Sequence, residues 1–171
     1  RQILYDQIVY DLKTAAPFAA PPEVFLAQGG REEKGLVIPI NDSEYRAVLT
    51  AWEGFSGSGT IIVRYGMGEK HIEWTDSIRG TLISAAQGGQ LRSSDGRFVM
   101  SFAPADVHRS MLLTVDRAGG DSVTSYVVGP VGQTLAGRPL VSITPDPGMK
   151  KPLIAAAWPI KKYADVKLPN S

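Results

Sequence analysis

Histidines and serines are the residues of this chain that could support nucleophilic chemistry. A serine hydrolase needs a serine hydroxyl within hydrogen-bond reach of an imidazole that acts as the general base. The chain has 2 histidines, His71 and His108, so any such device must use one of them. The candidate nucleophiles are Ser56, Ser58 and Ser110. A serine-type hydrolase is therefore one hypothesis that the sequence leaves open.

The segment 54–59, GFSGSG, departs from known glycine-rich catalytic loops. A nucleophile elbow has the pattern G-x-S-x-G at a turn from a strand into a helix, but its last glycine is replaced here by Ser58. A phosphate-binding loop needs a lysine and a following helix, whereas the strand-like TIIVRY follows Gly59. We therefore expect these small residues to let the chain reverse after Trp52, and we expect no cofactor.

The segment EKHIEW could place three metal-ligating side chains on one face. In a strand, Glu69, His71 and Glu73 would point to the same side because successive side chains alternate. An imidazole between two carboxylates could hold a divalent metal. A half-buried antiparallel strand shows the same alternation of polar and apolar residues. A metal- or carbohydrate-binding β module is thus a second alternative.

Aromatic residues near the C-terminus are candidates for a partner contact. Trp52 and Trp74 follow apolar patterns, so we expect both in the core. Trp158 lies in AAAWPIKKY beside lysines, and we expect it to be exposed together with Tyr163. Exposed aromatic side chains of this kind often anchor protein interfaces.

Composition excludes several classes of partner and chemistry. The net charge is +1 at pH 7, which does not fit a nucleic-acid-binding surface. With 0 cysteines there are no disulfides, catalytic thiols or thiolate metal sites. No apolar run approaches the roughly 20 residues of a membrane helix. Because the chain begins at Arg1, we expect a processed or trimmed chain with a possible upstream anchor.

Two helices are predicted in the first third of the chain. Leu4, Ile8 and Leu12 are spaced by four and predict a helix at about 2–14. In the segment 43–53, apolar residues recur at the helical spacing i, i+3, i+4 and i+7, which favours a second helix. These residues are Tyr45, Val48, Leu49 and Trp52. A strand remains the alternative there, because tertiary context often overrides propensity.

The remainder of the chain is typical of antiparallel β structure. The apolar segment 36–40, LVIPI, predicts a strand that Pro39 places at a sheet edge. Segments at 60–75, 81–102 and 109–129 predict hairpins, and Asp95-Gly96 is a strong turn signal. Later strands are predicted at 138–145 and 152–160, followed by a loose tail at about 161–171.

These observations predict one mainly β domain over residues 1–171, an antiparallel β-sandwich or open barrel preceded by one or two short helices. The leading functional hypothesis is a non-catalytic protein-protein interaction or assembly domain, which binds a protein partner or itself. We expect it in a bacterial envelope or secretion-related system, outside the cytoplasm. Edge strands and loops of a β domain suit partner binding.

Overall fold

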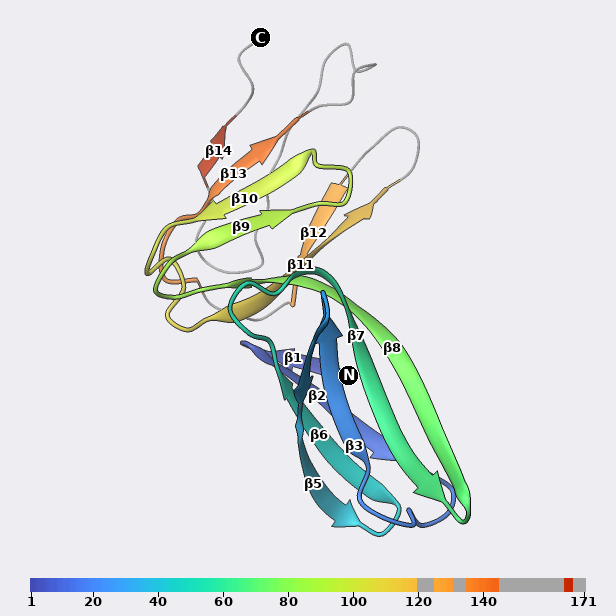
Figure 1. The fold of residues 1–171 in the computed structure, drawn as a ribbon. Helices are drawn as coiled ribbons and strands as arrows, with labels where there is room; N and C mark the ends of the chain where they lie inside the picture. The colour runs from blue at the N-terminus through green and yellow to red at the C-terminus, as the bar shows by residue number, and fades with distance from the viewer. Residues whose placement is uncertain (120–124, 131–134, 145–164, 168–171) are drawn as a thin grey trace. The chain divides into compact units, whose positions relative to one another are not determined.

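The chain folds mainly into antiparallel β-strands. The structure, a computed structural model, describes residues 1–119, 125–130, 135–144 and 165–167. These residues contain strands and turns and no helix, as Figure 1 shows. The backbone contacts divide the chain into two compact units, Arg1–Gly80 (unit 1) and Thr81–Ser171 (unit 2). The mainly β prediction is confirmed, whereas the prediction of a single domain over residues 1–171 stays a prediction.

Unit 1 is built from two sheets. One has the strand order β1-β2-β6-β5, and in the other β8, β7, β3 and β4 are neighbours in that order. The strands are β1 (Gln2–Leu4), β2 (Gln7–Lys13), β3 (Glu23–Gln28), β4 (Arg31–Lys34), β5 (Leu36–Asn41), β6 (Glu44–Thr50), β7 (Ser56–Met67) and β8 (Lys70–Ile83). Strand β8 continues past Gly80 into unit 2. Both sheets bury aliphatic side chains, such as Leu49 of β6 and Ile61 of β7.

The predicted helix at 2–14 is wrong. Strands β1 and β2 form an antiparallel hairpin, and Tyr5 in its turn has a φ of 57°. Ile8 and Tyr10 are buried while Val9 between them is less buried, so the period is 2 rather than 3.6. A spacing of four fits both periods, and it therefore could not distinguish a helix from a strand. The β-branched and aromatic residues of this segment favour the strand.

The predicted helix at 43–53 is wrong for a related reason. Ala47 and Leu49 of β6 are buried and Arg46 is exposed, which is the alternation of a strand. Asn41, which has the spacing of a helix cap, instead closes the turn between β5 and β6. Its Oδ1 accepts hydrogen bonds from the backbone N–H (3.0 Å) and the hydroxyl (3.1 Å) of Ser43. Such local bonds of asparagine favour turns over helices.

The segment 54–59 carries the chain from β6 in one sheet to β7 in the other. Gly54 lies in the turn with a φ of 89°, a left-handed conformation that suits glycine. Phe55 is completely buried, and its ring packs edge-on against Trp52 with a centroid distance of 5.3 Å. Gly59 lies against this ring, because a Cβ added there would be 2.7 Å from Phe55 Cζ. The motif is thus a structural joint anchored by one aromatic side chain.

One side chain from β3 holds the first residues of β7. Gln28 Nε2 donates hydrogen bonds to the carbonyl oxygens of Ser56 (2.9 Å) and Ser58 (3.0 Å). Its Oε1 accepts a hydrogen bond from the Ser56 N–H (3.1 Å). Gly57 between the two serines has a φ of 89°, so the strand is irregular there. The amide of Gln28 replaces the regular strand bonds that this irregular backbone cannot make.

Unit 2 contains the remaining strands. They are β9 (Gly89–Arg92), β10 (Phe98–Phe102), β11 (Met111–Ala118), β12 (Ser125–Gly129), β13 (Leu140–Ile143) and β14 (Asp165–Lys167). One sheet has the order β14-β13-β10-β9, with β14 parallel to β13, and β11 pairs with β12 and with the end of β8. The antiparallel pairs β9–β10 and β11–β12 confirm the predicted hairpins, and residues 120–124 of the turn predicted between β11 and β12 lie outside the described residues. The strand predicted at 152–160 and most of the tail at 161–171 lie outside the described residues.

A tight turn between β8 and β9 lies against the core of unit 2. The buried side chains of this core include Ile83, Met100 and Met111. The turn closes through backbone hydrogen bonds between Ser84 and Gly88 in both directions (3.1 and 2.8 Å). Gly88 has a φ of 74°, and a Cβ added there would lie 2.1 Å from the carbonyl oxygen of Phe102. Only glycine fits both the conformation and the space at this position.

The Asp-Gly turn between β9 and β10 is held by the side chain of Asp95. Its carboxylate accepts hydrogen bonds from the Ser93 hydroxyl (2.5 Å), the Arg97 N–H (3.1 Å) and the Tyr126 hydroxyl (2.8 Å). The guanidinium of Arg117 lies 3.8 Å away. Burial by itself raises the pKa of Asp95, but these hydrogen bonds and the Arg117 charge outweigh it and lower the pKa to about 2.

Protonation of Asp95 should therefore destabilise the protein in acid. A carboxyl with a lowered folded-state pKa contributes stability above its unfolded pKa, near 3.9, and this stability is lost as the pH falls through about 2. We expect Asp95→Asn to lower the free energy of unfolding by roughly 1–2 kcal/mol at pH 7, and by less at pH 2.5. Urea unfolding at both pH values measures this, with Asp116→Asn, an exposed aspartate of β11, as the control. Equal losses from Asp95→Asn at both pH values would contradict the expectation.

Candidate protein-binding surface

A row of large apolar side chains lies exposed along β5. Leu36, Ile38 and Ile40 are 63%, 43% and 50% exposed. Leu36 and Ile38 occupy alternate positions and therefore point to the same side of the sheet, and Ile40 follows them at the bulge between Pro39 and Asn41. The register places Leu36 opposite Val48 of β6, and Val48 opposite Val9 of β2. We call these five side chains, Leu36, Ile38, Ile40, Val48 and Val9, the β5 face.

The β5 face lies on the side of its sheet that faces away from the core of unit 1. Ala47 and Leu49, the neighbours of Val48 along β6, are fully buried on the other side. Exposed apolar side chains are ordinary when they are scattered singly, but a contiguous row is uncommon on a soluble surface and marks a contact site. This row is therefore the strongest candidate for a functional surface in the described part of the chain.

Glycine fixes where β5 begins. The chain leaves β4 of one sheet and enters β5 of the other at Gly35, whose N–H donates to the Val24 carbonyl oxygen (2.7 Å). A Cβ at this position would lie 2.6 Å from Leu49 Cδ2 and 2.9 Å from the Val48 carbonyl oxygen. The absence of a side chain lets β5 cross close to β6. Leu36 follows directly and starts the apolar row.

Strand β5 is the edge of its sheet, as Figure 1 shows and as Pro39 predicts. A proline in a strand takes an edge position, with its missing N–H on the unpaired side. The register also shifts between Pro39 and Asn41, so the strand bulges beside Ile40. Both features blunt an edge against pairing with another strand. The side chains of β5, rather than its backbone, are therefore what it offers to a partner.

Charged side chains share this side of the sheet and neutralise one another, and Arg46 lies directly opposite Ile38 in the register. Arg46 Nε donates to Asp11 Oδ1 (2.7 Å), and Lys13 Nζ lies 3.9 Å from Glu44 Oε2. The hydrogen bond from Arg46 lowers the pKa of Asp11, and the same bond raises the pKa of Arg46. These pairs are exposed and contribute little to stability. Their effect is that the surface around the apolar row carries no net charge from these four residues.

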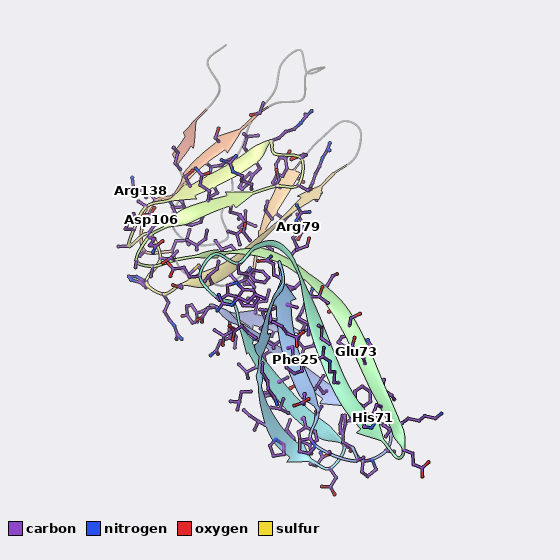
Figure 2. All side chains as sticks on the ribbon, in the orientation of Figure 1. Phe25, His71, Glu73, Arg79, Asp106 and Arg138 are labelled. Carbon is purple, nitrogen blue, oxygen red and sulfur yellow. The ribbon has the colours of Figure 1, made fainter. Side chains whose placement is uncertain are left out.

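The outward side of the other sheet of unit 1 has a different character. Arg64 of β7 donates to Glu73 of β8 (2.9 Å) and to Glu32 of β4 (3.2 Å). Its guanidinium lies 4.7 Å above the ring of Phe25, a cation–π contact that covers the ring. Figure 2 labels Phe25 and Glu73 on this sheet. A charged side chain thus covers the half-buried ring of Phe25 here, whereas Leu36 is 63% exposed among the described residues.

The residues of the hydrolase hypothesis are distributed over both units. Ser56 and Ser58 begin β7, while the Ser110 hydroxyl accepts a hydrogen bond from the Ala85 N–H (3.1 Å). His71 lies near the tip of the β7–β8 hairpin (Figure 2), and His108 is exposed between β10 and β11. Neither imidazole has a hydrogen-bond or ion-pair partner among the residues that the structure describes. The hydrolase hypothesis stays a prediction.

The three proposed metal ligands do not share one strand. Glu69 lies in the turn of the β7–β8 hairpin, and only His71 and Glu73 lie in β8. Glu73 accepts the hydrogen bond from Arg64. Over residues 1–119, 125–130, 135–144 and 165–167, no group of three or more histidine or acidic side chains could hold a metal ion. The metal- or carbohydrate-binding alternative stays a prediction as well.

The tryptophan predictions have different outcomes. Trp158 and Tyr163 lie outside the described residues. Trp52 is half-buried, with the Arg31 guanidinium 4.7 Å from its ring centroid. Trp74 is 44% exposed, so its prediction as a core residue is wrong, although its ring contacts the buried Tyr10 at 6.3 Å.

Sequence reasoning identified β5 as an edge strand and missed its exposed face. Every residue from Leu36 to Ile40 is apolar, so the alternation that separates a buried face from a solvent face is absent. The available signal was the combination of an edge proline with large aliphatic residues at alternate positions. Such a strand cannot bury both of its faces at the margin of a sheet.

Comparisons of the chain with known protein families, with curated proteins and with solved structures find no match. In the part of the chain that the structure describes, no helix has the length and hydrophobicity needed to cross a membrane.

Proposed function

We propose that this chain is a non-catalytic protein-binding or assembly domain whose contact surface is the β5 face. The observation that carries the proposal is the exposure of Leu36, Ile38 and Ile40 on one side of an edge strand. Aliphatic side chains at the centre of an interface, surrounded by polar residues, are typical of protein-protein contacts. The ion pair of Arg46, which lies opposite Ile38, and that of Lys13 supply polar groups next to the apolar row.

A β-sandwich is the architecture that we propose behind this surface. The ring of Phe18 contacts Tyr45 of β6 (5.2 Å) and Tyr65 of β7 (5.6 Å), which belong to different sheets. Tyr10 and Trp74 make a second contact of this type between β2 and β8. Sheets packed face to face keep their outward sides free for binding. The sandwich therefore supports a rigid, preformed contact surface.

The proposal extends to the setting of the domain. We infer an assembly in a bacterial envelope or secretion-related system, outside the cytoplasm, where contacts between β domains build larger structures such as pili. Fractionation of the native host, with an antibody against this chain, tests the compartment. Recovery from the cytoplasmic fraction alone would contradict this part of the proposal and leave the binding surface untouched.

Loss of partner binding on one substitution tests the function. We expect Ile38→Lys to reduce the amount of partner retained on the immobilised chain at least about tenfold, because it places a charge in the middle of an apolar contact. Capture from the native host's lysate, quantified by mass spectrometry, measures this. The matched control is Thr75→Lys, which adds the same side chain to an exposed position of β8. A partner retained equally by both variants would place the contact elsewhere.

A further inference from the structure

We infer that Asp95 and Gly96 form a latent modification site, at which isoaspartate appears when the β9–β10 turn opens and not while unit 2 is folded. Asp95-Gly96 is the only aspartyl-glycyl pair in the chain. An aspartate isomerises most readily before glycine, because glycine has no side chain to hinder attack by its own main-chain nitrogen. The inference concerns the chemistry of unit 2 and is independent of the β5 face.

The isomerisation needs no reactant other than water. The main-chain nitrogen of Gly96 attacks Cγ of the protonated Asp95 carboxyl and closes a five-membered succinimide ring. The carboxyl O–H group and the N–H proton leave together as water. A second water then breaks the bond between this nitrogen and the main-chain carbonyl carbon of Asp95. The backbone now runs through Cβ and Cγ, so the turn is one methylene longer and the free carboxylate is attached to Cα.

The folded turn keeps the carboxyl of Asp95 in its unreactive form. Oδ1 accepts hydrogen bonds from the Ser93 hydroxyl (2.5 Å) and the Arg97 N–H (3.1 Å), and Oδ2 accepts one from the Tyr126 hydroxyl (2.8 Å). Burial by itself would raise the pKa of Asp95, but these donors and the charge of Arg117 lower it to about 2. At neutral pH the group is therefore an ionised carboxylate, which resists attack by a nitrogen nucleophile.

The same turn also engages the attacking nitrogen. The Gly96 N–H donates a hydrogen bond to the carbonyl oxygen of Ser93 (3.0 Å). The Ser93 hydroxyl, which donates to Asp95, in turn accepts a hydrogen bond from the Phe98 N–H (3.0 Å). Closure of the succinimide ring therefore requires the Asp95 side chain to leave its donors and Gly96 to leave Ser93. Since these bonds belong to one network, we expect the reaction to require local opening of the turn.

Isoaspartate is expected to prevent the opened turn from closing again. Asp95 joins the two sheets of unit 2, because its turn connects β9 with β10 and its carboxylate binds Tyr126 of β12. After isomerisation the carboxylate is attached at a different backbone position, and the turn is longer. The ring of Tyr126 also packs against the buried Phe98, with a centroid distance of 5.3 Å. A displaced turn thus disturbs the core, and the modification acts in one direction.

Peptide mapping by a method that separates isoaspartate from aspartate tests the site. The full chain is incubated at neutral pH, either folded or unfolded in urea. We expect isoaspartate at position 95 to form at least about 100-fold more slowly in the folded chain, because only the opened turn reacts. Gly96→Ala should suppress the reaction in urea, since its methyl group hinders the nitrogen. Equal rates in the folded and unfolded chain, or no isoaspartate at position 95 in urea, would overturn the inference.

Tyr126→Phe tests whether the carboxylate network gives the protection. It removes one donor to Asp95 and keeps the ring against Phe98, so we expect it to raise the rate in the folded chain at least about threefold. The matched control is Tyr65→Phe in β7, whose ring also packs against a phenylalanine, Phe18. An unchanged rate in Tyr126→Phe would overturn the role of the network.

Refolding tests whether the modification acts in one direction. After incubation in urea and dilution, we expect unmodified chains to regain resistance to limited proteolysis and chains with isoaspartate at position 95 to be cleaved in unit 2. Equal resistance of modified and unmodified chains would overturn this step.

Discussion

Replacement of Gly88 by alanine is expected to lower the free energy of unfolding by about 3–5 kcal/mol, or to prevent unit 2 from folding. Two costs act at this position. The φ of 74° is a left-handed conformation that a residue with a Cβ adopts at a cost, and the added Cβ would lie 2.1 Å from the Phe102 carbonyl oxygen. The obstructing atom belongs to the backbone of β10, so no side chain can rotate away to relieve the contact.

Gly96→Ala separates these two costs. Gly96 has nearly the same φ, 71°, and an added Cβ would meet nothing within 4 Å. We expect this variant to lose only about 1 kcal/mol, the cost of the backbone conformation. Chemical denaturation of both variants, followed by tryptophan fluorescence and by far-ultraviolet circular dichroism, gives the difference. Equal losses at the two glycines would show that the turn at Gly88 can open to accept a side chain.

Removal of the Phe55 ring is expected to lower the free energy of unfolding by about 3–5 kcal/mol. Phe55 is completely buried, and its ring packs against Trp52 on one side and Gly59 on another. Truncation to alanine leaves a cavity at the joint between β6 and β7. Unfolding by urea measures the loss, and a change below about 1 kcal/mol would mean that the segment 54–59 is loosely packed and free for another role.

A double-mutant cycle tests whether Gly59 is required because the ring of Phe55 lies against it. Gly59→Ala alone places a Cβ 2.7 Å from Phe55 Cζ and should cost about 1–3 kcal/mol. In the Phe55→Ala background the obstacle is gone, so the cost of the second substitution should largely disappear. Additive losses would show that Gly59 is needed for the backbone rather than for the ring. The control is Gly66→Ala in β7, where φ is not left-handed and an added Cβ would come no closer than 3.6 Å to another atom.

The β-hairpins of this protein were predictable because each has a local turn signal. Gly96, which follows Asp95, and Gly68 in the β7–β8 hairpin have positive φ angles (71° and 59°), and a glycine beside a short polar residue is a local signal for such a turn. The hairpin of β1 and β2 has Tyr5 in its left-handed position, which no turn rule anticipates. Without that signal, apolar residues spaced by four were read as one helix.

The chemistry-bearing residues were a poor guide to the candidate site. Serines and histidines attract attention because their side chains can react, but Ser56 and Ser58 lie in a segment whose backbone Gln28 holds, and Ser110 supports a turn. The β5 face consists of ordinary aliphatic residues. Their exposure depends on which strand lies at the margin of the sheet and which face is covered, and both follow from long-range pairing rather than from local sequence.

Pro39 also bears on how large an assembly of this protein can grow. An exposed strand rich in leucine and isoleucine would ordinarily be a template for open-ended fibres, because each added strand presents a fresh edge to the next. The proline and the adjacent bulge interrupt that propagation while leaving the aliphatic side chains exposed. The side chains of β5 therefore remain available for contacts, while its backbone is poorly suited to pair with a further strand. The aliphatic side chains of β5 can therefore stay exposed on a strand whose edge does not favour fibre growth.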